Sequence, residues 1–160
     1  MPVAGTRRLA RERALGLLYE AELKSRPPSE VLAELPTPPD PYAVSLVEGV
    51  GERTVEIDGL LACHAVDWKV ERMPAVDRSL LRMATFELIG VPDTPTGVVI
   101  SEAVDIAKQY STEESGRFVN GVLAAVAREV RPEAGSSSGS PAAAQGQPGG
   151  KGREAGTIAT

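Results

Sequence analysis

Apolar residues recur every three or four positions in segment after segment up to about residue 130, and this periodicity constrains the fold more than any other feature of the chain. It is clearest at residues 111–130, where five apolar side chains share one helical face: Val119, Val122, Leu123, Val126 and Val130. Residues 98–100 favour a β-strand, but the run is short and lies within a helical pattern. The sequence therefore predicts an all-α fold.

Prolines, glycines and capping residues divide the periodic region into separate helices. We expect these helices at residues 6–24, 29–35, 40–66, 73–90, 99–110 and 111–130. Ser111 and Glu114 fit a capping box at the start of the last helix. Gly49 and Gly51 weaken the third helix and indicate that another helix backbone passes close to it.

The sequence also predicts where four further residues lie in this all-α fold. Cys63 is expected to be a small core residue, and Trp68 is expected to fill the junction before the helix at 73–90. Asp77 and Glu87 occupy polar positions of that helix.

The composition changes after Arg131. Residues 132–160 are rich in Gly, Ser, Ala, Gln and Pro and contain almost no large apolar side chain, so they cannot bury enough surface to offset the entropy lost on ordering. We therefore expect a folded domain at residues 1–131 and a disordered C-terminal tail at residues 132–160.

Several classes of function are disfavoured by what the sequence contains. The net charge of −5 gives no overall attraction to nucleic acid, so any such attraction is local. The only cysteine and the only histidine, Cys63 and His64, are adjacent rather than spaced as metal ligands. We find no phosphate-binding glycine loop, nucleophile elbow, membrane-length apolar run or secretory signal. We expect a soluble, cytoplasmic binding protein with no enzyme activity, cofactor or metal.

Positive charge is concentrated at the N-terminal end. Residues 1–13 contain one acid, Glu12, and four arginines: Arg7, Arg8, Arg11 and Arg13. Such a cluster can bind phosphates, and it can equally be a solvated helix face.

The start of the last predicted helix combines charge, a glycine and an aromatic side chain at residues 113–118. Free backbone amides at a helix start can bind a polar ligand. A capped core helix that simply buries Phe118 explains the same pattern.

Separate blocks of the chain, in this order and spacing, resemble the NusB family of bacterial transcription antitermination factors. The blocks are residues 11–14 (RERA), 18–20 (LYE), 46–50 (LVEGV), 77–82 (DRSLLR), 86–88 (FEL), 102–108 (EAVDIAK) and 113–123 (EESGRFVNGVL). The resemblance covers about residues 7–131, and the last block is the most specific.

The resemblance implies a helical bundle of two three-helix halves without enzyme activity. It also implies binding to single-stranded boxA RNA of nascent ribosomal-operon transcripts, beside the ribosomal protein NusE, within an RNA polymerase antitermination complex. No membrane is involved. Whether the chain is a monomer or a homodimer that hides its RNA-binding face stays open.

The resemblance further implies which residues bind RNA. Residue by residue, the family's RNA-binding surface falls on Arg7, Arg8, Arg11, Tyr19, Glu114 and Phe118. Arginines suit phosphates and aromatic rings suit unstacked bases, so these residue types fit single-stranded RNA. The chain departs from the family pattern at Leu9, which interrupts the arginines, and at Glu114, where Asp is common.

Two alternatives belong to other classes. A similar helical domain stands at the front of some RNA cytosine methyltransferases, but that interpretation requires a large catalytic domain after it. A helical protein-interaction module without RNA binding would keep the packing and the partner while showing no affinity for RNA.

Overall fold

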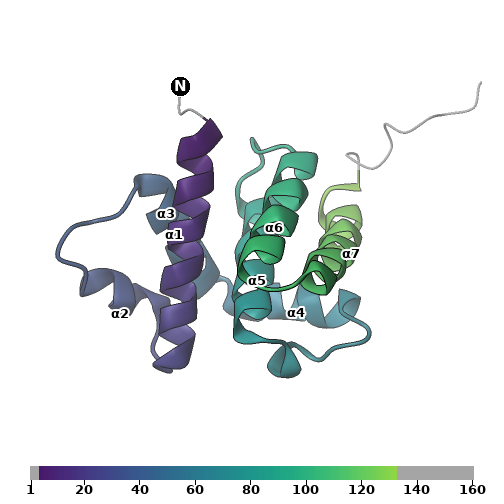
Figure 1. Cartoon of the computed structure of the whole chain (residues 1–160), viewed down its shortest axis with the longest axis horizontal. Helices are drawn as coiled ribbons and strands as arrows, with labels where there is room; N and C mark the ends of the chain where they lie inside the picture. The colour runs from purple at the N-terminus through teal and green to yellow at the C-terminus, as the bar shows by residue number, and fades with distance from the viewer. Residues whose placement is uncertain (1–3, 133–160) are drawn as a thin grey trace, which may run out of the picture.

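The computed structural model describes residues 4–132, and these residues form seven α-helices and one short 3-10 helix, η1 (Figure 1). The elements are α1 (Ala4–Leu23), α2 (Pro28–Ala33), α3 (Pro41–Glu52), α4 (Thr54–His64), η1 (Val70–Arg72), α5 (Ala75–Gly90), α6 (Thr96–Tyr110) and α7 (Glu113–Val130). No strand occurs among the described residues, so the all-α prediction is confirmed. The predicted disordered tail lies outside them, apart from Pro132.

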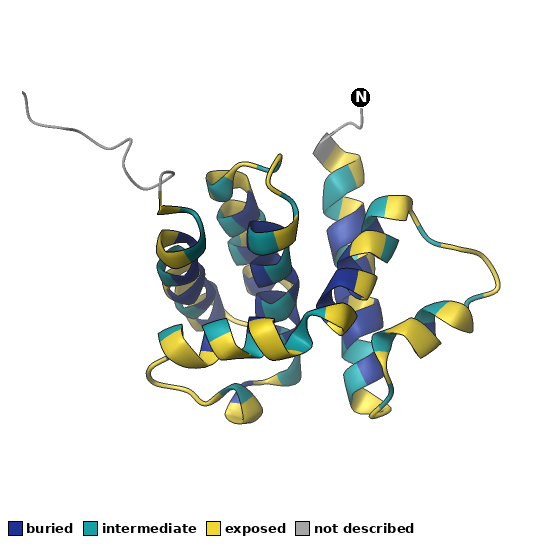
Figure 2. Ribbon diagram, turned by 180° about the vertical axis from the view of Figure 1, so that it is seen from behind, coloured by how far each residue is buried: buried dark blue, intermediate teal, exposed yellow. Residues whose placement is uncertain are grey.

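Two groups of helices share α5. Helices α1, α2 and α3 pack on one another, while α6 and α7 pack on each other and on α5. Helix α5 also contacts α1 and α3, and it therefore lies between the two groups. Figure 2 shows the buried positions on the inner sides of the helices. The core is aliphatic and includes Leu17, Leu46, Leu80, Ile106 and Leu123.

The predicted helix at 40–66 is two helices. Asp40 caps α3 as expected, since its side chain accepts a hydrogen bond from the Tyr42 amide at 2.8 Å. Arg53 then leaves helical geometry, with φ −115° and ψ 22°, and α4 begins at the next residue. The break lets α3 pack on α1 and α2 while α4 packs on α5 and α7, which one straight helix could not do.

The last helix begins one residue later than the capping-box prediction. The cap of α7 is Thr112, whose side chain accepts a hydrogen bond from the Ser115 amide at 3.0 Å. Ser111 stays outside the helix, and the predicted return bond from Glu114 is not among the hydrogen bonds of the described residues. The cap therefore uses one hydroxyl rather than a reciprocal pair.

Close packing at Gly49 involves a side chain, not the helix backbone that we expected. A Cβ atom at Gly49 would collide with the ring of Phe86 from α5. Gly51 has only ordinary van der Waals space toward Pro28. Cys63 is exposed rather than buried, so its predicted core role is wrong.

Arg131 connects the end of α7 to the end of α5 through hydrogen bonds. Its guanidinium donates hydrogen bonds of 2.7–3.1 Å to the carbonyls of Glu87, Leu88, Val91 and Thr94. These carbonyls belong to the end of α5 and the loop after it, where intrahelical donors run out. No helix within the described part of the chain is long and apolar enough to cross a membrane.

Candidate nucleic-acid interface

Arg7 lies at the start of α1 and stacks on an aromatic ring. Its guanidinium carbon is 3.8 Å from the centroid of the Tyr42 ring, which is cation–π geometry. Tyr42 comes from the first turn of α3, whose position is set by the Asp40 cap and Pro41. The α3 start thereby orients the first predicted RNA-binding arginine, which remains partly exposed.

Arg11 is buried in an ion pair, unlike the surface residue that the sequence predicts. Its Nε donates to both carboxylate oxygens of Glu87, at 3.0 and 3.1 Å, and Glu87 is itself only 1% exposed. The Tyr42 hydroxyl donates to the same carboxylate. The pair joins α1 to α5, and the guanidinium already has an acidic partner.

The electrostatics of this cluster follow from its burial. Burial alone lowers the pKa of Arg11, but the hydrogen bond and charge of Glu87 more than offset it and raise that pKa above its ordinary value. Burial raises the pKa of the Tyr42 hydroxyl, and the neighbouring Glu87 carboxylate raises it further. Arg11 is therefore charged and Tyr42 neutral at physiological pH.

Arg8 bridges α1 and α6. Its Nη1 donates to Glu102 at 2.9 Å, and its Nε donates to Glu12 at 3.3 Å. Asp105 lies 3.8 Å from the same guanidinium. Arg8 is partly exposed, so a phosphate could reach it, but it would compete with carboxylates already in place.

Tyr19 is half-buried and lines a small cavity of about 290 Å³ between α1, α5 and α6. Tyr110, at the last residue of α6, lines the same cavity and is 50% exposed. Helical spacing groups Tyr110 with the buried Ile106 and Ala107, so the sequence pattern does not predict its exposure. Two tyrosines therefore line the cavity, whereas the sequence predicts an RNA-binding role for Tyr19 alone.

The start of α7 is fixed by a buried carboxylate. The Ser115 hydroxyl donates to Oδ2 of Asp77 at 2.9 Å, and Asp77 is fully buried in the first turn of α5. Asp77 therefore lies inside the protein, contrary to its polar position in the sequence pattern. Glu114, the neighbour of Ser115, points to solvent and is exposed.

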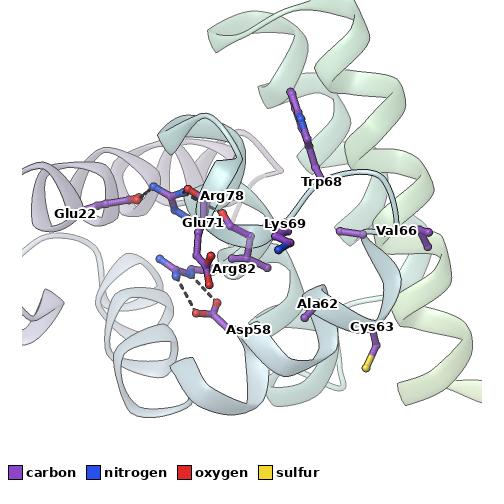
Figure 3. A pocket seen from close by; sticks show the side chains of 12 residues that line it. Glu22, Asp58, Ala62, Cys63, Val66, Trp68, Lys69, Glu71, Arg78 and Arg82 are labelled. Atoms are coloured by element: carbon purple, nitrogen blue, oxygen red, sulfur yellow. Dashed lines mark hydrogen bonds and ion pairs between the residues drawn. The ribbon is translucent and has the colours of Figure 1, made fainter.

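Phe118 is one turn further along α7 and is partly buried. Its ring meets that of Trp68 edge to face, with centroids 5.4 Å apart and planes at 80°. Trp68 does not fill a junction as the sequence indicated, because 43% of it is exposed. Figure 3 shows Trp68 extending from the loop after α4, away from the pair formed by Asp58 and Arg82.

The six predicted residues therefore take part in separate local contacts rather than in one contact cluster. Arg8 and Arg11 meet at Glu102, with Nη1 of Arg11 3.9 Å from that carboxylate. Tyr19 and Phe118 each stand beside a different aromatic residue, Tyr110 and Trp68. Across residues 4–132, no cluster of three or more His, Cys, Asp or Glu side chains could hold a metal ion.

Comparison with protein families finds a match to the NusB family model over residues 8–128. The transcription antitermination protein NusB of Salinispora tropica is 50% identical over 128 residues, which cover 76% of this chain and 94% of that protein.

Two solved structures share the fold. NusB of T. maritima has a TM-score of 0.73 and 34% identity, covering 84% of this chain and 98% of its own. A chain from the complex of antitermination factors NusB and NusE with dsRNA has a TM-score of 0.68 and 31% identity. The match covers 79% of this chain and 99% of that chain.

Proposed function

We propose that this chain, which belongs to the NusB family, is a transcription antitermination factor that binds RNA together with the ribosomal protein NusE. It acts by binding and catalyses no reaction. The observation that carries the proposal is the match, over most of both chains, to a complex containing NusB, NusE and RNA. Its setting is the RNA polymerase antitermination complex in the cytoplasm.

We take the RNA to be the boxA element in single-stranded form. Sequence-specific recognition of RNA mostly uses unpaired bases, which stack on aromatic side chains. Partly exposed aromatic rings at Tyr19, Tyr110 and Phe118 support this choice. The RNA in the related complex is described as double-stranded, so both forms belong in the test.

The predicted residues then divide by role. Arg7 and Arg8 contact phosphates, while Tyr19 and Phe118 contact bases. Arg11 is held by Glu87, and we assign it the task of orienting α1 rather than a phosphate contact of its own. Glu114 stands at the exposed start of α7, where a carboxylate can accept hydrogen bonds from base amino groups.

Few free positive charges imply weak binding by the protein alone. For single strands, log affinity falls with log salt by about 0.7 for each phosphate neutralised, so the two contacts of Arg7 and Arg8 give a slope of about −1.4. NusE should therefore tighten binding by adding contacts of its own.

The test is a salt series on variants with boxA RNA, single- and double-stranded, with and without NusE. Arg8→Ala should weaken binding to all RNAs and shrink the slope by about 0.7. Phe118→Ala and Tyr19→Ala should lose about 1–3 kcal/mol with the slope unchanged. Circular dichroism confirms that each variant is folded.

Folded Tyr19→Ala and Phe118→Ala variants that bind boxA RNA as tightly as the wild type would contradict the assignment of the aromatic residues. Wild-type protein that binds NusE but no RNA would favour the interaction module without RNA binding.

The folded binding domain in this proposal is residues 1–131, and the family match over residues 8–128 supports it. Residues 132–160 take no part in it. A chain that ends at Pro132 should bind boxA RNA and NusE like the full chain, and a loss of affinity would assign the tail a role.

A further inference from the structure

The loop between α4 and η1 places the single tryptophan of the chain beside the proposed RNA-binding surface. Trp68 is a large apolar side chain, yet 43% of it is exposed. One of its packing partners is Phe118, to which the preceding proposal assigns a base contact. An exposed aromatic ring in contact with a base-binding ring requires an explanation.

The geometry of the two rings suits two separate bases. Their centroids are 5.4 Å apart and their planes lie at 80°. Bases stacked on perpendicular rings are splayed apart instead of stacked on each other. Single-stranded RNA is recognised in this splayed arrangement, with individual bases on aromatic faces.

Uncommitted positive charge lies near the tryptophan. Lys69 and Arg72 follow it in the chain, and Arg117 precedes Phe118; all three side chains are exposed. None of the three forms an ion pair with any residue that the structure describes. By contrast, Arg8 and Arg11 are bound to carboxylates. Two exposed acids, Asp67 and Glu71, flank Lys69 in the chain, so the charge around Trp68 is mixed.

Trp68 also borders a crevice of about 880 Å³ at the ends of α1 and α4 and the start of α5. The other basic residues in it are occupied, since Arg82 pairs with Asp58 and Arg78 with Glu22 (Figure 3). Lys69 is therefore the basic residue of the crevice that forms no ion pair with the described residues. An RNA strand that leaves Phe118 can continue over Trp68 toward this lysine.

We propose that Trp68 is a second stacking platform, which takes a base of single-stranded RNA adjacent to the base held by Phe118. The inference rests on the proposed RNA-binding function and extends its surface to the loop after α4. It adds a base contact that the N-terminal arginines and Tyr19 do not provide.

The first experiment needs no variant, because the chain contains one tryptophan. Unlabelled single-stranded boxA RNA is titrated into the protein while Trp68 fluorescence is recorded, and binding is followed independently by the anisotropy of labelled RNA. A base stacked on the indole should quench the fluorescence in step with binding. RNA that saturates the protein without changing the fluorescence would overturn the inference and leave the proposed function standing.

The second experiment compares variants. Trp68→Ala should weaken boxA RNA binding about fivefold to a hundredfold, with an unchanged salt slope, and Trp68→Phe should restore most of the affinity. Val66→Ala is the matched control, because Val66 is an 89% exposed apolar residue of the same crevice without a ring.

Two other outcomes separate the possibilities. If Trp68→Ala reduces the affinity for NusE and not for RNA, Trp68 is a protein contact and the inference is wrong. If the wild-type chain binds no RNA by anisotropy, with or without NusE, the proposed function fails and the inference fails with it.

Discussion

Two arginines of α1, Arg8 and Arg11, are bound to carboxylates, whereas the aromatic residues around the start of α7 keep part of their rings free. Arg11 is buried against Glu87, and Arg8 is held by Glu102. Phe118 and Trp68, in contrast, touch each other only through an edge-to-face contact, and Trp68 remains 43% exposed. Both regions belong to the same proposed RNA-binding surface.

The difference indicates what each region contributes. A buried ion pair has already exchanged its hydration for a partner, so Arg11 mainly holds α1 on α5. A partly exposed ring can bind a base without giving up an existing bond. We infer that the α1 region supplies structure and modest charge, while the aromatic region supplies most of the base discrimination.

The largest expected effect tests the structural role of α1. Arg11→Ala leaves the Glu87 carboxylate buried without its cation, so unfolding by urea should show a loss of about 3–5 kcal/mol in the free energy of unfolding. Arg13→Ala is the control, because Arg13 is exposed on the same helix and should change stability by about 0.5 kcal/mol or less. Equal stabilities of the two variants would show that Arg11 is not a structural residue.

A smaller loss is expected at the start of α7. Ser115→Ala removes a hydroxyl that donates to the buried carboxylate of Asp77, and hydrogen bonds to charged groups contribute about 1.5–3 kcal/mol. Ser101→Ala serves as the control, since Ser101 is exposed on α6. If urea unfolding gives the same midpoint for both variants, Asp77 does not fix the start of α7.

Removing a competing acid should improve RNA binding. Glu102→Gln frees Arg8 from its closest carboxylate, so the affinity for boxA RNA should rise up to about fivefold, the equivalent of a partly exposed ion pair of about 1 kcal/mol or less. Asp105→Asn should have less effect, because Asp105 is 3.8 Å from Arg8 and more exposed. Unchanged RNA affinity in Glu102→Gln would mean that Arg8 does not contact phosphate.

The smallest effect on stability is expected at Glu114. Glu114→Gln removes an exposed charge from the first turn of α7, where its interaction with the helix dipole contributes about 0.3–1 kcal/mol. Thermal unfolding should therefore shift slightly while the helix content stays constant. A loss as large as that of Ser115→Ala would show that Glu114 has a partner on the folded protein.

The helices could be predicted because their signals are local. Apolar spacing along α7 identified Val119, Val122, Leu123 and Val126, and all four are buried. The Asp40 cap was found by the same local logic, since a capping side chain reaches only two or three residues along the chain. The family blocks are likewise a property of the linear sequence, and the match over residues 8–128 agrees with them.

Other features depend on which helices pack together, and only the tertiary structure determines them. Nothing near Arg11 in the sequence distinguishes it from Arg7 or Arg8, because its partner Glu87 lies 76 residues away on α5. The break at Arg53 lets α3 and α4 pack on different helices. The exposure of Trp68 depends on where the loop after α4 runs relative to α7. Periodicity within a segment specifies a helix and its apolar face. Contacts between segments determine which polar residues are buried and which aromatic rings stay free to bind.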